Sequence, residues 1–132
     1  MSKVVEQWHE IVRNQDAAGL DSLLAEDVVF HSPVVHTPQV GKKITRLYLM
    51  AAMKVLNEPG HFVYLREVVQ GQHAVLEFQT EIDGVTVNGV DMIEWNEAGQ
   101  IIDFKVMVRP LKAVSAIHAA MGAMLEAFKG GR

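Results

Sequence analysis

The chain of 132 residues contains no cysteine. Disulfide bonds, thiolate catalysis and zinc sites with sulfur ligands are therefore excluded. Positive charge is also scarce, because 12 Lys and Arg stand against 16 Asp and Glu, giving a formal net charge of −4, and the basic residues are scattered. A nucleic-acid interface needs a basic patch or stripe, so we expect no nucleic-acid partner.

Long apolar runs and targeting signals are the next absences. No segment approaches the roughly 20 apolar residues of a membrane-spanning helix, so we expect no membrane partner. The first residues lack the apolar stretch and cleavage signature of a signal peptide, so we expect a cytoplasmic protein. The length suits one core, and we expect a single domain over residues 1–132.

Short catalytic motifs are missing as well. The sequence has no GxSxG, no P-loop, no GxGxxG and no HExxH, so nucleotide binding and nucleophile–base catalysis have no support. His31 and His36 flank Pro33, but two histidines without a third ligand do not indicate a metal site. We therefore expect no cofactor and no metal.

Helical periodicity is typical of the first half of the chain. It predicts helices over residues 3–15 and 19–27, and a third that begins at Gly41 and ends at the NEPG segment, residues 57–60. Residues 28–38 hold two β-rich runs, each followed by a proline, which predicts a bent edge strand.

Four β-rich runs follow at residues 61–69, 73–82, 85–95 and 101–108. They predict an antiparallel meander, in which Asp83-Gly84 is a strong hairpin signal. Residues 111–128 then place apolar side chains on one helical stripe. Helices followed by a meander indicate an α+β fold, with helices on one face of the sheet.

The run VTVNGVDMIEW, residues 85–95, carries a carboxylate on its more apolar face. An ionised Asp91 in an apolar interior is costly unless it is paired, hydrogen-bonded or neutralised by a raised pKa. Gly89 on the same face leaves a gap beside it. Asp91 either addresses a ligand in a pocket or is a structural group that accepts a hydrogen bond, for example from the Trp8 indole.

The opposite face of the predicted sheet is mixed. Apolar and charged side chains alternate there: Val75, Val90, Met92 and Met107 lie among Glu77, Glu94, Lys105 and Arg109. Such a surface suits a second copy of the chain, so we expect a homodimer through the sheet. The alternative is a solvated face with cross-strand ion pairs.

Two segments, DAAGLDSLLAEDVVFHSPVVHTPQVGKKI and VNGVDMIEWNEAGQIIDFKVMV, resemble in this order the nuclear transport factor 2-like superfamily. The resemblance covers about Trp8 to Pro110 and is closest to the SnoaL-like or ketosteroid-isomerase-like branch. It implies a cone-shaped (cystatin-like) fold, in which N-terminal helices wrap a curved antiparallel sheet around an internal apolar cavity. An extra helix at the C-terminus is expected here, and a dimer through the sheet is common in the branch.

Steroid isomerases of this branch use a Tyr, an Asp base before a Pro, and a neutral Asp in the meander. The resemblance places these roles on Trp8, Ser32 and Asp91. Serine is a poor base and indole cannot replace phenol as a proton donor, so steroid isomerisation is disfavoured. Either His31 or His36 is then expected to move the proton, while Asp91 donates a hydrogen bond to an oxygen. Because strand alternation is lost around Pro33, the inward residue could be His31 or Ser32.

We therefore expect the cavity to bind a small, largely apolar molecule. If the protein is an enzyme, the expected reaction is proton transfer at a carbon beside a carbonyl, or an associated cyclisation. The residues expected to contact the ligand are Trp8, Ser32, Tyr48, Phe78 and Phe104. An epoxide hydrolase is not supported, because Phe78, Thr80 and Val106 occupy the positions of its water-activating residues. The alternative is a non-catalytic ligand-binding or dimerisation module in which Asp91 is a buried structural group.

Overall fold

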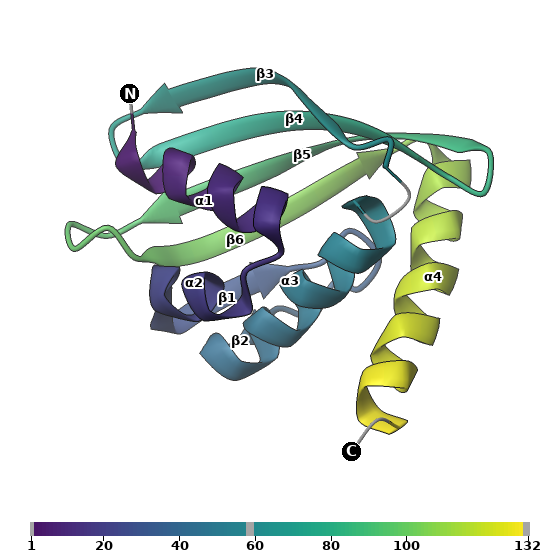
Figure 1. Ribbon diagram of the computed structural model, residues 1–132, viewed down its shortest axis with the longest axis horizontal. Coiled ribbons are helices and arrows are strands. Elements are labelled where there is room, and N and C mark those ends of the chain that lie inside the picture. The colour runs from purple at the N-terminus through teal and green to yellow at the C-terminus, as the bar shows by residue number, and fades with distance from the viewer. Residues whose placement is uncertain (1, 58–59, 131–132) are drawn as a thin grey trace.

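Four helices and a curved, unclosed six-stranded sheet make up the computed structural model, which describes residues 2–57 and 60–130 (Figure 1). The elements are α1 (Lys3–Asn14), α2 (Ala17–Leu23), β1 (Leu24–His31), β2 (Gln39–Val40), α3 (Lys42–Asn57), β3 (Val63–Gln70), β4 (His73–Ile82), β5 (Val85–Trp95), β6 (Ile101–Arg109) and α4 (Leu111–Gly130). The α+β class, the curved sheet and the C-terminal helix are as predicted. The predicted end of the third helix is right at Asn57, while residues 58–59 of the NEPG segment lie outside the described part of the chain.

The strands lie in the order β2-β1-β6-β5-β4-β3. The predicted antiparallel meander from β3 to β6 is confirmed, and both residues of the Asp83-Gly84 turn have positive φ angles, 49° and 78°. These angles are those that a tight hairpin turn requires.

Strand β1 differs from its prediction in three ways. The helix expected over residues 19–27 ends at Leu23, and the chain enters β1 at once. β1 is not an edge strand, because it pairs in parallel with β6 on one side and with the two-residue β2 on the other. The second β-rich run, residues 34–36, forms no strand. Pairing with β6 buries Val28 and Phe30, a long-range contact that local periodicity does not reveal.

Local signals explain where the first helices begin. The Ser2 hydroxyl caps α1 by accepting a hydrogen bond from the Val5 backbone N–H, and the Asp16 carboxylate caps α2 through the Gly19 N–H. The buried stripe of α1 includes Trp8 and faces the sheet. Figure 1 shows α1, α2 and α3 on the same side of the sheet, so the core lies between these helices and the concave face.

The outer face of the sheet is the mixed surface that the sequence predicts. Its exposed apolar side chains include Val68, Val75, Met92 and Met107. Among them, Arg66 Nε and Glu77 Oε1 form a cross-strand ion pair at 2.9 Å.

Helix α4 corrects an expectation about apolar runs. By length and composition Leu111–Phe128 could cross a membrane, although little of this segment is buried in the fold. A single such helix does not identify a membrane protein, because core helices of soluble proteins meet the same criterion. Here Ala113 and Ile117 are buried against the rest of the chain.

Candidate functional site

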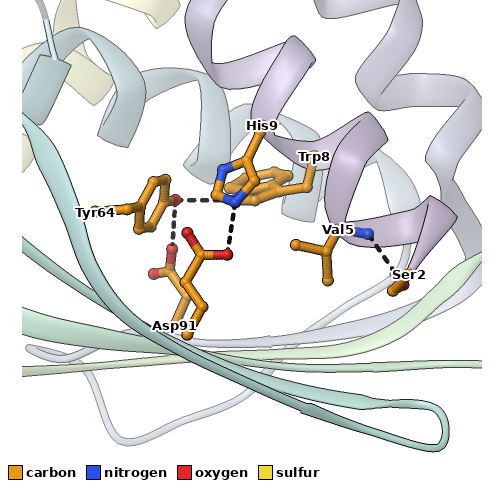
Figure 2. A network of polar contacts seen from close by, with 7 residues as sticks. Ser2, Val5, Trp8, His9, Tyr64 and Asp91 are labelled. Atoms are coloured by element: carbon orange, nitrogen blue, oxygen red, sulfur yellow. Dashed lines mark hydrogen bonds and ion pairs between the residues drawn. The ribbon is translucent and has the colours of Figure 1, made fainter.

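Trp8, Tyr64 and Asp91 form a chain of hydrogen bonds between α1, β3 and β5 (Figure 2). The Trp8 indole Nε1 donates to the Tyr64 hydroxyl at 2.8 Å, and that hydroxyl donates to Asp91 Oδ2 at 2.9 Å. The direct bond from Trp8 to Asp91, which was one interpretation of the buried carboxylate, is not formed, because Tyr64 lies between them. The tyrosine satisfies the indole donor and fixes one oxygen of the carboxyl group.

The protonation of this chain follows from burial. Asp91 is only 6% exposed. Burial raises the pKa of Asp91 to about 7, and the hydrogen bond from Tyr64 acts in the opposite direction. Burial, followed by the nearby charge of Asp91, raises the pKa of Tyr64 well above 10. Near neutral pH the carboxyl group thus exchanges a proton readily, whereas the phenol keeps its own.

A second contact between α1 and β3 covers the chain of hydrogen bonds. His9 Nε2 lies 2.9 Å from Glu67 Oε1, and the His9 ring meets the Tyr64 ring edge-on with centroids 4.8 Å apart (Figure 2). His9 and Glu67 are both partly exposed. The His9 ring thus packs directly against Tyr64.

An apolar pocket of about 60 Å³ adjoins Asp91. We call it the inner pocket. Its walls are largely aromatic and aliphatic, with Phe62 stacked on Phe78 at a centroid distance of 5.2 Å and Trp8 against Phe104 at 4.9 Å. The polar residues among its lining are Trp8, Ser32, Asn57, Tyr64 and Asp91.

The gap expected at Gly89 is filled. Gly89 pairs with Phe78 across β4 and β5, and an added Cβ would lie 2.5 Å from Phe78 Cζ and 2.7 Å from the Met107 carbonyl oxygen. The glycine therefore makes room for the aromatic ring rather than for a ligand, and the ring covers the bare backbone.

Five of the sequence-predicted residues meet at the inner pocket: Trp8, Ser32, Phe78, Asp91 and Phe104. Tyr48 does not line it, because the ring packs on Phe30 with centroids 5.7 Å apart.

The two histidines expected to move a proton are not in the inner pocket. Alternation along β1 turns Phe30 inward and His31 outward, where His31 Nε2 lies 3.0 Å from Asp103 Oδ1. His36 is exposed in the loop after β1. Of the two residues left open around the bend, Ser32 is the one that lines the inner pocket. Among the described residues, no three His, Asp or Glu side chains come together as a metal site requires.

Tyr64 is the residue that sequence reasoning missed. The β3–β4 pairing shifts register between Tyr64 and Glu67, so the inward and outward faces of β3 cannot be read by counting alternate residues. The sequence shows a tyrosine in a β-rich run, but it does not show which buried group the Tyr64 hydroxyl would bond.

Comparison with known proteins agrees with this architecture. The family model described as a SnoaL-like domain matches residues 5–104. No curated protein matches the chain. A solved steroid delta-isomerase from Pseudomonas aeruginosa is similar, at 32% identity with 96% of this chain and 92% of that chain covered and a TM-score of 0.90.

An uncharacterised bacterial protein with a cystatin-like fold, from Silicibacter pomeroyi, is 35% identical over 93% of this chain and 85% of that chain, with a TM-score of 0.85. A de novo designed protein with a curved β-sheet shares the fold alone, at 19% identity over 90% of this chain and 98% of that chain, with a TM-score of 0.69. With the family model covering most of the chain, this protein belongs to the SnoaL-like domain family.

Proposed function

We propose that the protein binds a small, largely apolar carbonyl compound in the inner pocket and that Asp91 transfers a proton at the carbon beside the carbonyl. One observation carries this proposal. Among the described residues the Asp91 side chain has a single hydrogen-bond partner, Tyr64 at Oδ2, and otherwise lines an apolar pocket where burial raises its pKa to about 7. A carboxyl group with a pKa near the working pH is suited to general acid–base catalysis.

The roles of the other polar residues follow from their bonds. Tyr64 holds the carboxyl group in place and retains its own proton. Ser32 Oγ accepts a hydrogen bond from the Val34 N–H at 3.1 Å, which leaves the hydroxyl proton free to donate. Ser32 and Asn57 both line the inner pocket and are the candidate donors to a developing enolate oxygen.

In this reaction ionised Asp91 takes a proton from the carbon beside the carbonyl, and the electron pair of the broken C–H bond moves onto the carbonyl oxygen as an enolate. Protonated Asp91 returns the proton to the same carbon or, in an unsaturated ketone, to a more distant one. The first outcome is exchange and the second is isomerisation. The similarity to a steroid delta-isomerase supports this class of reaction, although Trp8 and Ser32 argue against steroid isomerisation by the branch's known set of groups.

The size of the inner pocket limits the ligand. Sites for small molecules commonly measure about 300–1,000 Å³, whereas the inner pocket measures about 60 Å³. Binding of a ring-sized molecule therefore requires side chains to move. Met53 and Met121, which line the inner pocket from α3 and α4, are unbranched and adapt at low cost.

The competing proposal is a non-catalytic ligand-binding or dimerisation module. It is favoured by the same small pocket, and by the Tyr64 hydrogen bond that gives Asp91 a structural partner. For either proposal we expect a homodimer through the outer face of the sheet, where exposed Val75 and Met92 lie among charged residues.

Hydrogen–deuterium exchange separates the two proposals. Cyclohexanone in D₂O should exchange the protons beside its carbonyl faster with the protein than with buffer, as followed by NMR. Asp91→Asn should abolish the acceleration, and Asp103→Asn should retain it, because Asp103 is absent from the lining of the inner pocket. The wild-type rate should rise with pH around the pKa of Asp91, about 7. Binding of cyclohexanone without any acceleration would instead support the module.

A further inference from the structure

A second pocket lies where β1 leaves the sheet. Pairing between β1 and β6 ends at His31 and Lys105, but β6 continues to Arg109. The chain bends away at Pro33, and a pocket of about 380 Å³ opens between this bend and residues 105–108 of β6. We call it the outer pocket.

The outer pocket adjoins the inner pocket. Four residues line both of them: Ser32, Pro33, Val106 and Val108. These residues form a wall that the two pockets share, so a molecule held in the inner pocket reaches the outer one when their side chains move. The two pockets also differ in character, since the outer pocket is larger and more polar.

All ionisable residues that line the outer pocket are basic. They are His31, His36 and Lys105. Asp103 Oδ1 lies 3.0 Å from His31 Nε2, but Asp103 is not among the lining residues. Half-buried Lys105 forms no hydrogen bond or ion pair with another residue in the described part of the chain, so its ammonium group is available to an anion.

We propose that the ligand of the inner pocket carries a carboxylate, which Lys105 binds in the outer pocket together with His31 and His36. This inference rests on the proposed function and adds the class of substrate, a small oxo acid rather than a neutral ketone. A partly buried ammonium group attracts an anion more strongly than a solvated ammonium group does. Although the chain has a net charge of −4, Lys105 therefore provides a local site for an anion. The small apolar part of such a ligand matches the inner pocket, and the acid matches the outer one.

A pair of probes that differ in charge tests the inference. NMR titration should give a dissociation constant for 4-oxocyclohexanecarboxylate about 10-fold or more below that of the neutral 4-oxocyclohexanecarboxamide. The carboxylate alone should shift the backbone amide signals of Val35 and His36. Lys105→Met should make the two probes bind alike, whereas Lys112→Met should retain the preference, because Lys112 is exposed on α4 and lines neither pocket.

The outcomes separate this inference from the proposed function. If cyclohexanone binds and the carboxylate has no advantage over the carboxamide, only the oxo-acid inference is overturned. A preference that survives Lys105→Met overturns it too. If none of the three ketones binds, the proposed function fails and the inference fails with it. Should Lys105→Met not fold, wild-type protein still provides the test, since raising the salt concentration should weaken the carboxylate alone.

Discussion

Replacing Asp91 with Asn should make the protein more stable at neutral pH. Raising the pKa of a carboxyl group from its ordinary 3.8 to about 7 corresponds to about 4 kcal/mol at 1.36 kcal/mol per pH unit. The folded state binds the proton more tightly than the unfolded state does. The stabilisation is therefore fully present below pH 3.8 and is lost as the pH rises through about 7. Asn keeps an acceptor for Tyr64 but never ionises, so it avoids the loss.

The measurement is urea denaturation of both proteins between pH 5 and pH 8. The free energy of unfolding of wild type, relative to that of Asp91→Asn, should fall by about 3 kcal/mol over this range. Asp27→Asn is the matched control, because Asp27 is exposed on β1. This variant should shift the stability by less than about 0.5 kcal/mol at any pH in the range.

The reasoning is refuted if the difference in the free energy of unfolding between wild type and Asp91→Asn stays constant from pH 5 to pH 8. Such a result would mean that Asp91 has the same pKa in the folded and unfolded states. The ¹³C chemical shift of the Asp91 carboxyl group, followed across the same pH range, reports the pKa directly. It should show a midpoint near 7.

Three further changes test the rest of the site and the sheet. Tyr64→Phe removes the hydroxyl between two buried groups, so we expect a loss of about 1–3 kcal/mol in denaturation and a pKa of Asp91 above its wild-type value by NMR. Gly89→Ala should lower the free energy of unfolding by about 1–3 kcal/mol in the same assay, because the added Cβ would lie 2.5 Å from the Phe78 ring. The control Gly122→Ala should be neutral or stabilising, because no atom lies within 4 Å of its added Cβ. Native mass spectrometry and light scattering should show a homodimer that Met92→Lys on the outer face weakens, and a monomeric wild type would contradict the dimer.

Much of the fold could be predicted because its signals are local. The meander follows from four β-rich runs and a hairpin dipeptide, and both are as predicted. The inward position of Asp91 follows from strict alternation along β5, which has ten residues in unbroken pairing with β4. Phe78 and Phe104 were placed in the core by the same counting.

The errors arise where the geometry is set by distant parts of the chain. The parallel pairing of β1 with β6 joins residues more than 70 positions apart, and this pairing decides that His31 faces outward. The register shift in β3 hides the inward face of Tyr64. Similarly, the space beside Gly89 is open in a single strand but is filled by the facing Phe78 in the sheet.

The hydrogen bonds around Asp91 do not by themselves require an ionisable group. Tyr64 and Trp8 need only one acceptor between them, because the indole donor is already satisfied by the Tyr64 hydroxyl. An amide oxygen would accept the Tyr64 proton equally well, without the free-energy cost of about 4 kcal/mol that ionisation in this apolar pocket entails at neutral pH. A carboxyl group at this position is thus worse for stability than its neutral isostere, and what it adds is a proton that can leave and return near pH 7. If Asp91→Asn is both more stable and inactive in the exchange assay, the carboxyl group is there for chemistry; if it is more stable and no wild-type activity exists to lose, the chemistry proposed for Asp91 is wrong.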